Sequence, residues 1–564
     1  MFPNVIMRYY MLSFRLIALP KGNAFKKLIF SSLSCLYFTF AIALLAIFQY
    51  PIYAIKYILV SLPPAFFFIL LFSCVHGKIF SIILILQAIY LSIINFFLLY
   101  HTALYGVPVS NEGYFVIFEA FHIEKLHENM SWLKSNFELF PAVTVFIIIV
   151  IFILLTKKTL SYSNENSFSF IIVITSVMLF ALGLYKYKNP VEVFSKYQQT
   201  AIIIQYKRYQ DLLVELKNIR NETSTVKIQA TCDVFKKNPL FVVIIGESAS
   251  RHHWGLYGYT RQTTPLIAMT HNIFPFFDVV SSSCTTISSL MRALTIQKDG
   301  KRISLVDFFN AAGFTTELYS NQPEGGQYDS FLGYIFNNIQ KKYYAMKYGQ
   351  YMKPDGIILN NILTAIQKND GPKIIFVHLL GSHVDFIDRY PSEFAHFTSS
   401  DIILEKNYLP ESKKYFAIQR INSYDNSIFY TDTLLHKIIQ ATAKTNRYSY
   451  VLYFSDHGEE NFEFRDYYGR GGMNSTIVYD IPLILWSSDL FLTENSHLLS
   501  KQIRERKLWL GNLASSVLQL SGIKSEIQSE LETTTFFAPQ FIAKPRICDG
   551  IDYTTLQSPN NVTH

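Results

Sequence analysis

Cysteine is scarce in this chain, and no two cysteines stand close together. Only five occur in 564 residues. Structural zinc sites built from thiolates need pairs of cysteines a few residues apart, so a site of that kind is excluded. The formal charge of +8 is modest and spread along the chain, which gives no ground for a nucleic-acid partner. Internal repeats and low-complexity tracts are also missing, so we expect neither a repeat protein nor a nucleic-acid-binding protein.

Charged residues are missing from five long apolar segments in the first third of the chain. A helix needs about 20 apolar residues to cross the hydrocarbon core of a membrane, and each segment approaches that length. Five such segments do not suit the buried core of a soluble domain. Pro63 and Pro64 would kink the second helix, which neighbouring helices can accommodate. The sequence therefore predicts a transmembrane domain with five helices, at about 28–50, 57–75, 79–100, 139–156 and 168–185.

Lysine and arginine in the short loops predict how this domain is oriented, because cytoplasmic loops carry an excess of both. The basic start of the chain, Lys78, and the pair Lys157 and Lys158 are therefore assigned to the cytoplasm, whereas the acidic loop 101–138 lies outside. No cleavage pattern precedes the first segment, which is expected to remain as an anchor. The expected parts are a cytoplasmic N-terminus (1–27), the five-helix transmembrane domain (28–185), an external connector (186–237) and an external domain (238–564).

The external domain alternates short apolar runs of strand composition with helical patterns. The runs are LFVVIIGES, FTTELYSN, KIIFVHLLGSH, YSYVLYFSDHG and IPLILWSS. Continuous apolar strands with helices between them predict an α/β domain with a mostly parallel central sheet covered by helices. In such sheets, ligands bind beyond the carboxyl ends of the strands.

Several of these predicted strands end in polar side chains. Glu247 follows the first strand, and Asp456 and His457 follow a later one. Two carboxylates and one imidazole form a ligand set that suits zinc. A polar turn at the surface is the alternative for the SDHG stretch alone. Since several strand ends converge at one edge of the sheet, we favour the metal site.

A fourth ligand is expected in the segment SSSCTTISSLMRALTI. The apolar residues after Thr286 have helical spacing, which places Thr285 and Thr286 at the start of a helix. Either threonine could simply cap that helix. Alternatively, a threonine hydroxyl bound to the metal would attack phosphorus, and backbone amides at the helix start would favour a phosphate there. The spacing alone leaves both threonines open.

Several motifs occur in a fixed order behind the five apolar segments. They are VVIIGESASRHHWGLYGYTRQTTP, the Cys-Thr-Thr helix start, FVHLLGSHVDFIDRYP, INSYDNSIFYTDTLL and YFSDHGEE. Together they closely resemble the phosphoethanolamine transferases of Gram-negative bacteria, which are inner-membrane enzymes with a periplasmic alkaline-phosphatase-like (sulfatase) domain. The resemblance covers nearly the whole chain and implies the same fold and location here.

The resemblance also implies roles for individual residues. Thr286 matches the nucleophile, with Thr285 as the neighbouring possibility. His383 matches a histidine near the phosphoethanolamine group. The other positions implied are the zinc ligands Glu247, Thr286, Asp456 and His457, the accessory His378, and Asn321 and Gln322, which match the headgroup-binding positions more loosely.

The reaction, cofactor and partners follow from the same resemblance. Thr286, activated by zinc, would attack the phosphorus of phosphatidylethanolamine, release diacylglycerol and become phosphoethanolamine-threonine. Lipopolysaccharide would then accept the group, in lipid A or in the core. Covalent catalysis of this kind divides one difficult displacement into two. We expect a monomeric, multi-pass protein of the bacterial inner membrane with its catalytic domain in the periplasm.

Two departures from the family pattern concern the site. The family has a further histidine shortly after its Asp-His pair, but here the next one is His497. Arg470 is expected to contact phosphate in that region, although a guanidinium cannot act as a general acid or base near neutral pH. Cys284 also has no cysteine nearby for the local disulfide that lipid A-modifying members often have, so an acceptor other than lipid A stays open.

Three alternative functions remain on sequence grounds. A phosphoglycerol transferase of the lipoteichoic-acid type would share the fold, the membrane segments and a metal-bound threonine. A sulfatase is disfavoured, because Cys284 lacks the Cys-x-Pro-x-Arg context of a formylglycine site. A catalytically inactive membrane scaffold is the third.

The three cysteines of the external part allow at most one disulfide. Cys232 and Cys548 flank the external domain, so we expect these two to be joined in an oxidising compartment and Cys284 to be free.

Overall fold

The computed structural model describes residues 22–47, 51–75, 77–105, 114, 118, 139–165, 170–187, 189–195, 198–223, 228–299, 301–322, 333, 335–346, 353–398, 408–409, 411–470, 475–526 and 533–559. Residues 1–21 of the predicted cytoplasmic N-terminus and most of the acidic loop 101–138 lie outside this description. The chain forms two compact units, of which one contains 1–115 and 136–210 and the other contains 116–135 and 211–564.

Five long helices of the first unit overlap the five predicted apolar segments. Among the described residues, Ala142–Leu160 is the helix long and apolar enough to cross a membrane by length and composition. Shorter apolar helical stretches of this unit are Tyr57–Phe72, Gly77–Tyr90 and Val173–Lys186. The five helices are α2 (Asn23–Ile47), α3 (Pro51–Cys74), α4 (Gly77–Tyr105), α7 (Leu139–Leu160) and α8 (Phe170–Tyr187). The helices α9 (Pro190–Ser195) and α10 (Gln198–Thr223) follow.

Packing within the first unit relies on apolar side chains and one buried lysine. Helix α2 packs against α3 and α7, and α3 packs against α8. The Lys27 ammonium donates hydrogen bonds to the backbone oxygens of Val75 (2.7 Å) and Glu165 (2.8 Å), which ties the start of α2 to the end of α3 and to the turn after α7. Large apolar side chains such as Ile79 and Phe146 remain exposed, which suits a lipid environment better than water.

The second unit is built on a seven-stranded sheet. Its strand order is β3, β13, β10, β2, β9, β7, β8. The pairs from β10 through β8 are parallel, whereas β13 pairs antiparallel with both β10 and β3. The sheet is therefore mixed, and its antiparallel edge departs from a purely parallel arrangement. The strands are β2 (Leu240–Gly246), β3 (Ile273–Phe276), β7 (Thr315–Ser320), β8 (Lys341–Tyr344), β9 (Lys373–His378), β10 (Ser449–Ser455) and β13 (Leu483–Ser487).

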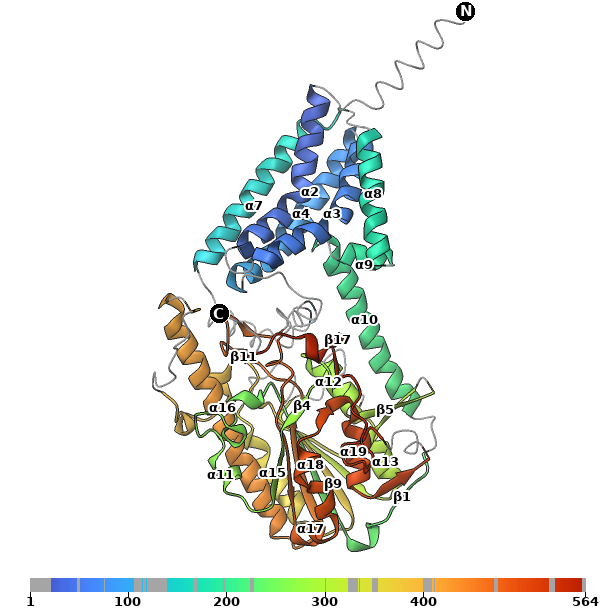
Figure 1. Cartoon of the computed structure of the whole chain (residues 1–564), viewed down its shortest axis with the longest axis vertical. Coiled ribbons are helices and arrows are strands. Elements are labelled where there is room, and N and C mark those ends of the chain that lie inside the picture. Colours follow the sequence, from blue (N-terminus) through green and yellow to red (C-terminus); the bar gives the residue numbers. More distant parts are fainter. Residues whose placement is uncertain are drawn as a thin grey trace, which may run out of the picture. The chain divides into compact units, whose positions relative to one another are not determined.

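Helices cover both faces of this sheet, because alternate residues of each central strand point to opposite faces. Along β2, Phe241, Val243 and Ile245 belong to one apolar cluster, whereas Val242 and Ile244 belong to another. The first cluster includes residues of α12 (Thr286–Ala293), α13 (Leu305–Ala311) and α19 (Leu513–Leu520), and the second includes residues of α15 (Gly356–Gln367) and α16 (Glu411–Ala443). Figure 1 shows α15 and α16 on one side of the sheet and α13 and α19 on the other.

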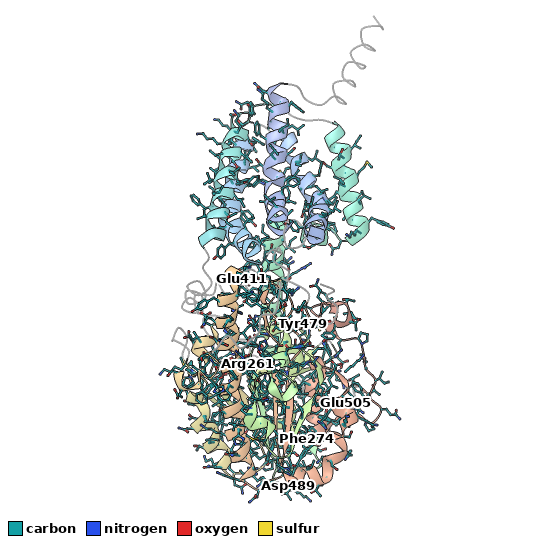
Figure 2. The ribbon with its side chains drawn as sticks, turned by 60° about the vertical axis from the view of Figure 1, so that its left-hand side comes forward. Arg261, Phe274, Glu411, Tyr479, Asp489 and Glu505 are labelled. Atoms are coloured by element: carbon teal, nitrogen blue, oxygen red, sulfur yellow. The ribbon has the colours of Figure 1, made fainter. Side chains whose placement is uncertain are left out.

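Shorter elements complete the second unit, and side chains fill the space between its layers (Figure 2). They are α11 (Pro265–Ala268), α17 (Asp489–Asn495), α18 (Lys501–Arg504) and the paired strands β1 (Ala230–Cys232) with β15 (Ile523–Ser525), β4 (Asp278–Val280) with β14 (Lys507–Trp509), β5 (Thr295–Lys298) with β6 (Lys301–Ser304), β11 (Glu460–Asn461) with β12 (Tyr468–Gly469), and β16 (Ile547–Cys548) with β17 (Ile551–Asp552).

The expected disulfide between Cys232 and Cys548 is wrong, since both thiols are free. Cys232 lies on β1, and its sulfur contacts the backbone oxygen of Ser521. Cys548 is wholly buried on β16, and its sulfur lies 3.3 Å from the backbone oxygen of Ser281. The C-terminal strand therefore packs beside the segment before α12, and not against β1.

Candidate metal centre

The register between two parallel strands brings two carboxylates together. Ser455 of β10 pairs with Gly246 of β2, so Asp456 and Glu247 are the next residues on adjacent strands. His457 follows directly. Ligand atoms of Glu247, Asp456 and His457 all lie within 4.8 Å of one another, and all three side chains are buried. The structure thus brings together the three strand-end residues that the sequence analysis singled out.

Thr286 joins these residues from the start of α12. Its hydroxyl oxygen lies 3.2 Å from each carboxylate oxygen of Glu247 and 3.3 Å from His457 Nε2. Thr285 occupies the preceding N-cap position, but its hydroxyl makes no capping bond. That hydroxyl instead meets the Ser283 hydroxyl at 3.1 Å and is buried. The two adjacent threonines therefore have different surroundings, and Thr286 is the one beside the carboxylates.

The backbone fixes which nitrogen of His457 faces the cluster. Its Nδ1 lies 2.9 Å from the backbone oxygen of Gly458. Because a carbonyl oxygen only accepts, Nδ1 carries the hydrogen, and the lone pair of a neutral ring is on Nε2. Nε2 lies 3.3 Å from Glu247 Oε1 and 3.2 Å from Asp456 Oδ2. A ring held through one nitrogen in this way is typical of metal-ligating histidines.

The residues present fit a zinc ion. Asp456 Oδ1 accepts hydrogen bonds from the backbone nitrogens of Ser248 (3.0 Å) and His457 (2.8 Å). Asp456 Oδ2 is buried and has no hydrogen-bond partner among the described residues. Buried carboxylate oxygens without a hydrogen bond are costly unless a cation is present. Two carboxylates, one imidazole and one hydroxyl are donors that zinc accepts.

Electrostatics in the cluster also favour a bound cation. Burial, followed by the charge of Glu247, raises the pKa of Asp456 to about 7. Burial opposes protonation of His457, but the Asp456 and Glu247 carboxylates together outweigh burial and raise the pKa of that ring. Burial also opposes ionisation of the Glu247 carboxyl. Its hydrogen bond to His457 and the nearby His383 and Arg470 nevertheless hold its pKa well below the usual value. In the absence of metal, protons would therefore be retained near neutral pH.

Arg470 follows β12 and lies beside the same cluster. Its guanidinium contacts His457 Nε2, and its Nη1 lies 3.7 Å from Glu247 Oε1. The Nε2 lone pair can serve either this guanidinium or a metal ion, so Arg470 must shift when a metal binds. Its permanent positive charge would then be available to a phosphate.

His378 and His383, which the sequence analysis singled out at and beyond the end of β9, differ in their surroundings. His378 is the last residue of the strand, and burial lowers its pKa to about 4, so the ring is neutral. Its Nε2 has no hydrogen-bond partner among the described residues. His383 Nδ1 donates to the backbone oxygen of Val384 at 2.8 Å, which leaves its Nε2 as the acceptor nitrogen of a neutral ring.

The predicted headgroup residues use their amide donors within the fold. Asn321 is wholly buried, and its Nδ2 donates to Lys353 O and Asp355 Oδ1, both at 2.8 Å. Gln322 is half-buried, and its Nε2 donates to Leu379 O at 3.3 Å. Asn321 therefore ties the end of β7 to Lys353 and Asp355 inside the fold, whereas Gln322 is closer to the surface.

Sequence reasoning missed Asp549, which braces the loop before Thr286. Its Oδ2 accepts from the backbone nitrogen of Cys284 (2.8 Å) and from the Tyr479 hydroxyl (3.1 Å). Its own backbone nitrogen donates to Ser282 O at 3.2 Å. An acid that bonds to backbone 265 residues away leaves no local signal in the sequence.

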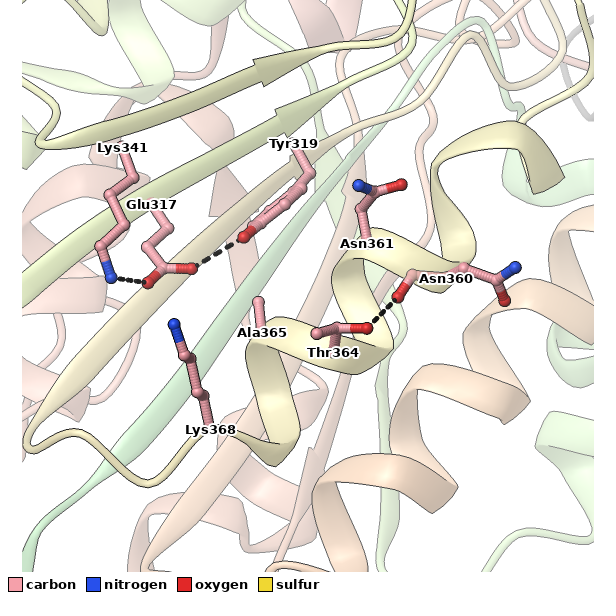
Figure 3. Close-up of a pocket in the computed structure, with 8 residues that line it drawn as sticks. All are labelled: Glu317, Tyr319, Lys341, Asn360, Asn361, Thr364, Ala365 and Lys368. Carbon is pink, nitrogen blue, oxygen red and sulfur yellow. Dashed lines mark hydrogen bonds and ion pairs between the residues drawn. The ribbon is translucent and has the colours of Figure 1, made fainter.

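A separate pocket of about 330 Å³ lies between β7, β8 and α15. Figure 3 shows the Tyr319 hydroxyl and the Lys341 ammonium pointing to the Glu317 carboxylate, at 3.0 and 2.9 Å. The candidate metal ligands do not line it. The residues that do are Glu317, Tyr319, Lys341, Asn360, Asn361, Thr364, Ala365 and Lys368.

Residues 239–523, about half of the chain, match the family model described as sulfatase. This chain therefore belongs to the sulfatase family. Similar curated proteins are phosphoethanolamine transferases, which confirms the resemblance seen in the sequence. Phosphoethanolamine transferase EptC of Escherichia coli K12 is 28% identical over 379 residues, and the match covers 62% of this chain but only 64% of that protein.

Solved structures agree with this assignment. The zinc complex of the C-terminal periplasmic domain of Escherichia coli EptC has a TM-score of 0.53 and 27% identity, and the match covers 58% of this chain and 96% of that one. The integral membrane protein lipooligosaccharide phosphoethanolamine transferase A (EptA) from Neisseria meningitidis has a TM-score of 0.60, with 88% of this chain and 96% of that chain covered. At 17% identity, the second likeness concerns the fold alone.

Removing one ligand should remove the metal. We expect about one tightly held zinc per wild-type chain, and we expect Asp456→Ala and His457→Ala to lose it, because each takes away a buried donor. Metal analysis of the purified proteins measures this, with His497→Ala as a control outside the cluster. Full zinc content in both ligand variants would rule out this centre.

Zinc binding should displace protons, and more of them at lower pH. Asp456, whose pKa is raised to about 7, holds a proton at lower pH that a metal must replace, and the raised pKa of His457 acts in the same direction. Calorimetric titration of metal-free protein in buffers of different ionisation enthalpy should give more protons released per zinc at about pH 6 than at about pH 8, with weaker binding at the lower pH. Equal proton release at both pH values would contradict the assignment of these two residues as ligands.

Proposed function

We propose that this chain is a zinc-dependent phosphoethanolamine transferase that moves the group from phosphatidylethanolamine to lipopolysaccharide. The observation that carries the proposal is the position of the Thr286 hydroxyl, 3.2 Å from both Glu247 oxygens and 3.3 Å from His457 Nε2. A hydroxyl that contacts both oxygens of one buried carboxylate and an imidazole supports a nucleophilic role better than a capping role. The names of the similar proteins supply the group transferred.

The first half-reaction forms a bond between Thr286 Oγ1 and phosphorus and breaks the bond to diacylglycerol. Zinc bound by Glu247, Thr286, Asp456 and His457 would ease deprotonation of the hydroxyl and offset phosphate charge. Arg470 holds a phosphate oxygen with its permanent charge. His383, in its protonated form, gives its Nε2 proton to the departing diacylglycerol oxygen, since its Nδ1 is engaged by Val384. The Thr286 proton goes to solvent. The product is phosphoethanolamine-threonine.

In the second half-reaction, an oxygen of the acceptor attacks the same phosphorus, and Thr286 leaves and takes a proton from solvent to become the alcohol again. His383 then takes the proton from an acceptor hydroxyl, in the reverse of its first role. Gln322 lies on the headgroup side, with His378 and Asn321 supporting the site from behind. The acceptor is lipid A or the core of lipopolysaccharide, for which the curated relatives include a Kdo(2)-lipid A phosphoethanolamine 7''-transferase of Escherichia coli K12, 26% identical over 264 residues.

The location proposed for this reaction is the bacterial inner membrane. The helices α2, α3, α4, α7 and α8 would cross it, and the second unit would act in the periplasm as a monomer. Helices with exposed apolar side chains support this location. A membrane anchor would also keep the enzyme close to a donor that is itself a membrane lipid.

Substitution of the nucleophile should separate the two threonines. Thr286→Ala should abolish diacylglycerol release, whereas Thr285→Ala should lose about 1 kcal/mol of stability, the worth of one hydrogen bond, and keep its activity. Fragmentation mass spectrometry after incubation with phosphatidylethanolamine should place the adduct on Thr286. An adduct on Thr285 would overturn the assignment of Thr286 as the nucleophile. A phosphoglycerol adduct formed from phosphatidylglycerol would favour the phosphoglycerol transferase, and the absence of any adduct would favour an inactive scaffold.

Reporter fusions should reveal the orientation. A reporter active only in the periplasm should work when fused after Lys188 or at His564 and should be silent at Lys158, because five crossings alternate the sides. A cytoplasmic signal from His564 would mean that one segment does not cross.

Mass spectrometry of lipopolysaccharide from cells with and without the gene should identify the acceptor. We expect phosphoethanolamine on lipid A or on the core only when wild-type protein is present, with Thr286→Ala as the matched control. Identical lipopolysaccharide in all three strains would exclude this acceptor.

A further inference from the structure

Asp355 is a buried acid that the proposed reaction does not use. It stands immediately before α15, yet its side chain makes no capping bond to that helix. Its Oδ1 accepts from the backbone nitrogen of Leu380 and from Asn321 Nδ2, both at 2.8 Å. Its Oδ2 accepts from the backbone nitrogen of Gly381 at 2.9 Å. The carboxylate therefore holds two consecutive backbone amides of the loop after β9.

That loop lies directly against the backbone of Glu247. Leu379 donates its backbone hydrogen bond to Ile245 O at 2.9 Å, and Ser382 donates to Glu247 O at 2.9 Å. Gly381, with φ of +55°, fits between these contacts. A Cβ added there would lie 2.8 Å from both the backbone nitrogen and oxygen of Glu247. The Asp355 bonds therefore set how closely this loop approaches Glu247.

The same loop carries His383, whose backbone nitrogen donates to Leu380 O at 3.2 Å. Leu380 is thus bonded on one side to Asp355 and on the other to the turn that ends in His383. A single side chain fixes the approach to the Glu247 backbone and the start of the histidine turn.

A carboxylate suits this place better than a neutral amide would. Three donors converge on Asp355, and an asparagine offers only one acceptor oxygen. Its amide nitrogen would face one of the loop amides, donor against donor. Burial raises the pKa of Asp355, while the bonds from Leu380, Gly381 and Asn321 oppose that rise. An acid retained in so buried a position needs several bonds to offset its desolvation.

We propose that Asp355 is a positioning residue for the metal centre, which sets the place of Glu247 and of His383 through the loop Leu380–Gly381. It acts through these residues and does not itself touch metal or substrate. The inference rests on the proposed role of Glu247 as a zinc ligand. Outer partners of metal ligands commonly change metal affinity by about 10- to 100-fold when they are replaced.

The test compares Asp355→Asn with a matched control, Asp432→Asn. Asp432 is also buried and also accepts from two consecutive backbone amides, those of Leu266 and Ile267, both at 2.9 Å. Those amides begin α11, which carries none of the candidate ligands. Full-length protein in detergent is titrated with zinc against a chelator, and thermal unfolding is measured without metal. We expect Asp355→Asn to bind zinc at least about tenfold more weakly and Asp432→Asn to bind it as the wild type does, although both unfold at lower temperature.

Wild-type zinc affinity in Asp355→Asn, with only a lower unfolding temperature, would overturn the inference and leave Asp355 a purely structural residue. A wild-type protein that binds no zinc would instead overturn the proposed metal centre, and this inference with it.

If Asp355→Asn does not fold, Gly381→Ala tests the same contact from the loop. Its Cβ would press on the Glu247 backbone, so we expect the same loss of affinity, whereas Gly258→Ala, with φ of +95° and open space around it, should retain wild-type binding. Unchanged binding by Gly381→Ala would also overturn the inference.

Discussion

The parallel pairing of β2 with β10 is the constraint on which the site depends. It is in register to the last residue, Ser455 opposite Gly246, so the residues that follow, Asp456 and Glu247, emerge side by side. Two carboxylates in a buried place repel each other, and within the described part of the chain one oxygen of Asp456 has no hydrogen bond. The strands of the sheet therefore create a local need for positive charge. A bound cation, a proton and the Arg470 guanidinium are the three ways in which that need can be met.

The segments around these strand ends are held by two acids that bond to backbone amides, the buried Asp355 and the half-buried Asp549. Asp549 holds the loop that leads to Thr286, and Asp355 holds the loop that leads to His383. Each acid comes from a part of the chain remote from the loop that it holds. In the proposed reaction, the Thr286 hydroxyl and His383 would need fixed positions relative to the candidate metal ligands, and bonds to backbone amides fix a loop without occupying the site. The scaffold thus consists of rigid strand ends with braced loops between them.

The chain combines a unit of apolar helices with a unit that carries the candidate site. In the first, large apolar side chains remain exposed on the helices, and the buried Lys27 is satisfied by two backbone oxygens. In the second, helices cover both faces of the sheet, and the polar residues gather at its carboxyl edge. An enzyme whose donor and acceptor are both lipids would need these two environments in one chain, which is how we interpret the combination.

The sequence by itself determined the parts that depend on neighbours along the chain. Apolar runs ending in polar residues predicted β2, β7, β9, β10 and β13, and they singled out Glu247, Asp456 and His457, because strand composition and strand ends are local properties. Tertiary structure decided the rest. Which threonine faces the carboxylates depends on the direction in which α12 begins, and the sequence spacing allowed both. The antiparallel edge of β13 and β3, and the packing of Cys548 beside Ser281 instead of Cys232, depend on how distant segments pair. The roles of Asp355 and Asp549 could not be predicted for the same reason. Backbone amides occur in almost any sequence, so only the folded chain shows which amides a carboxylate binds.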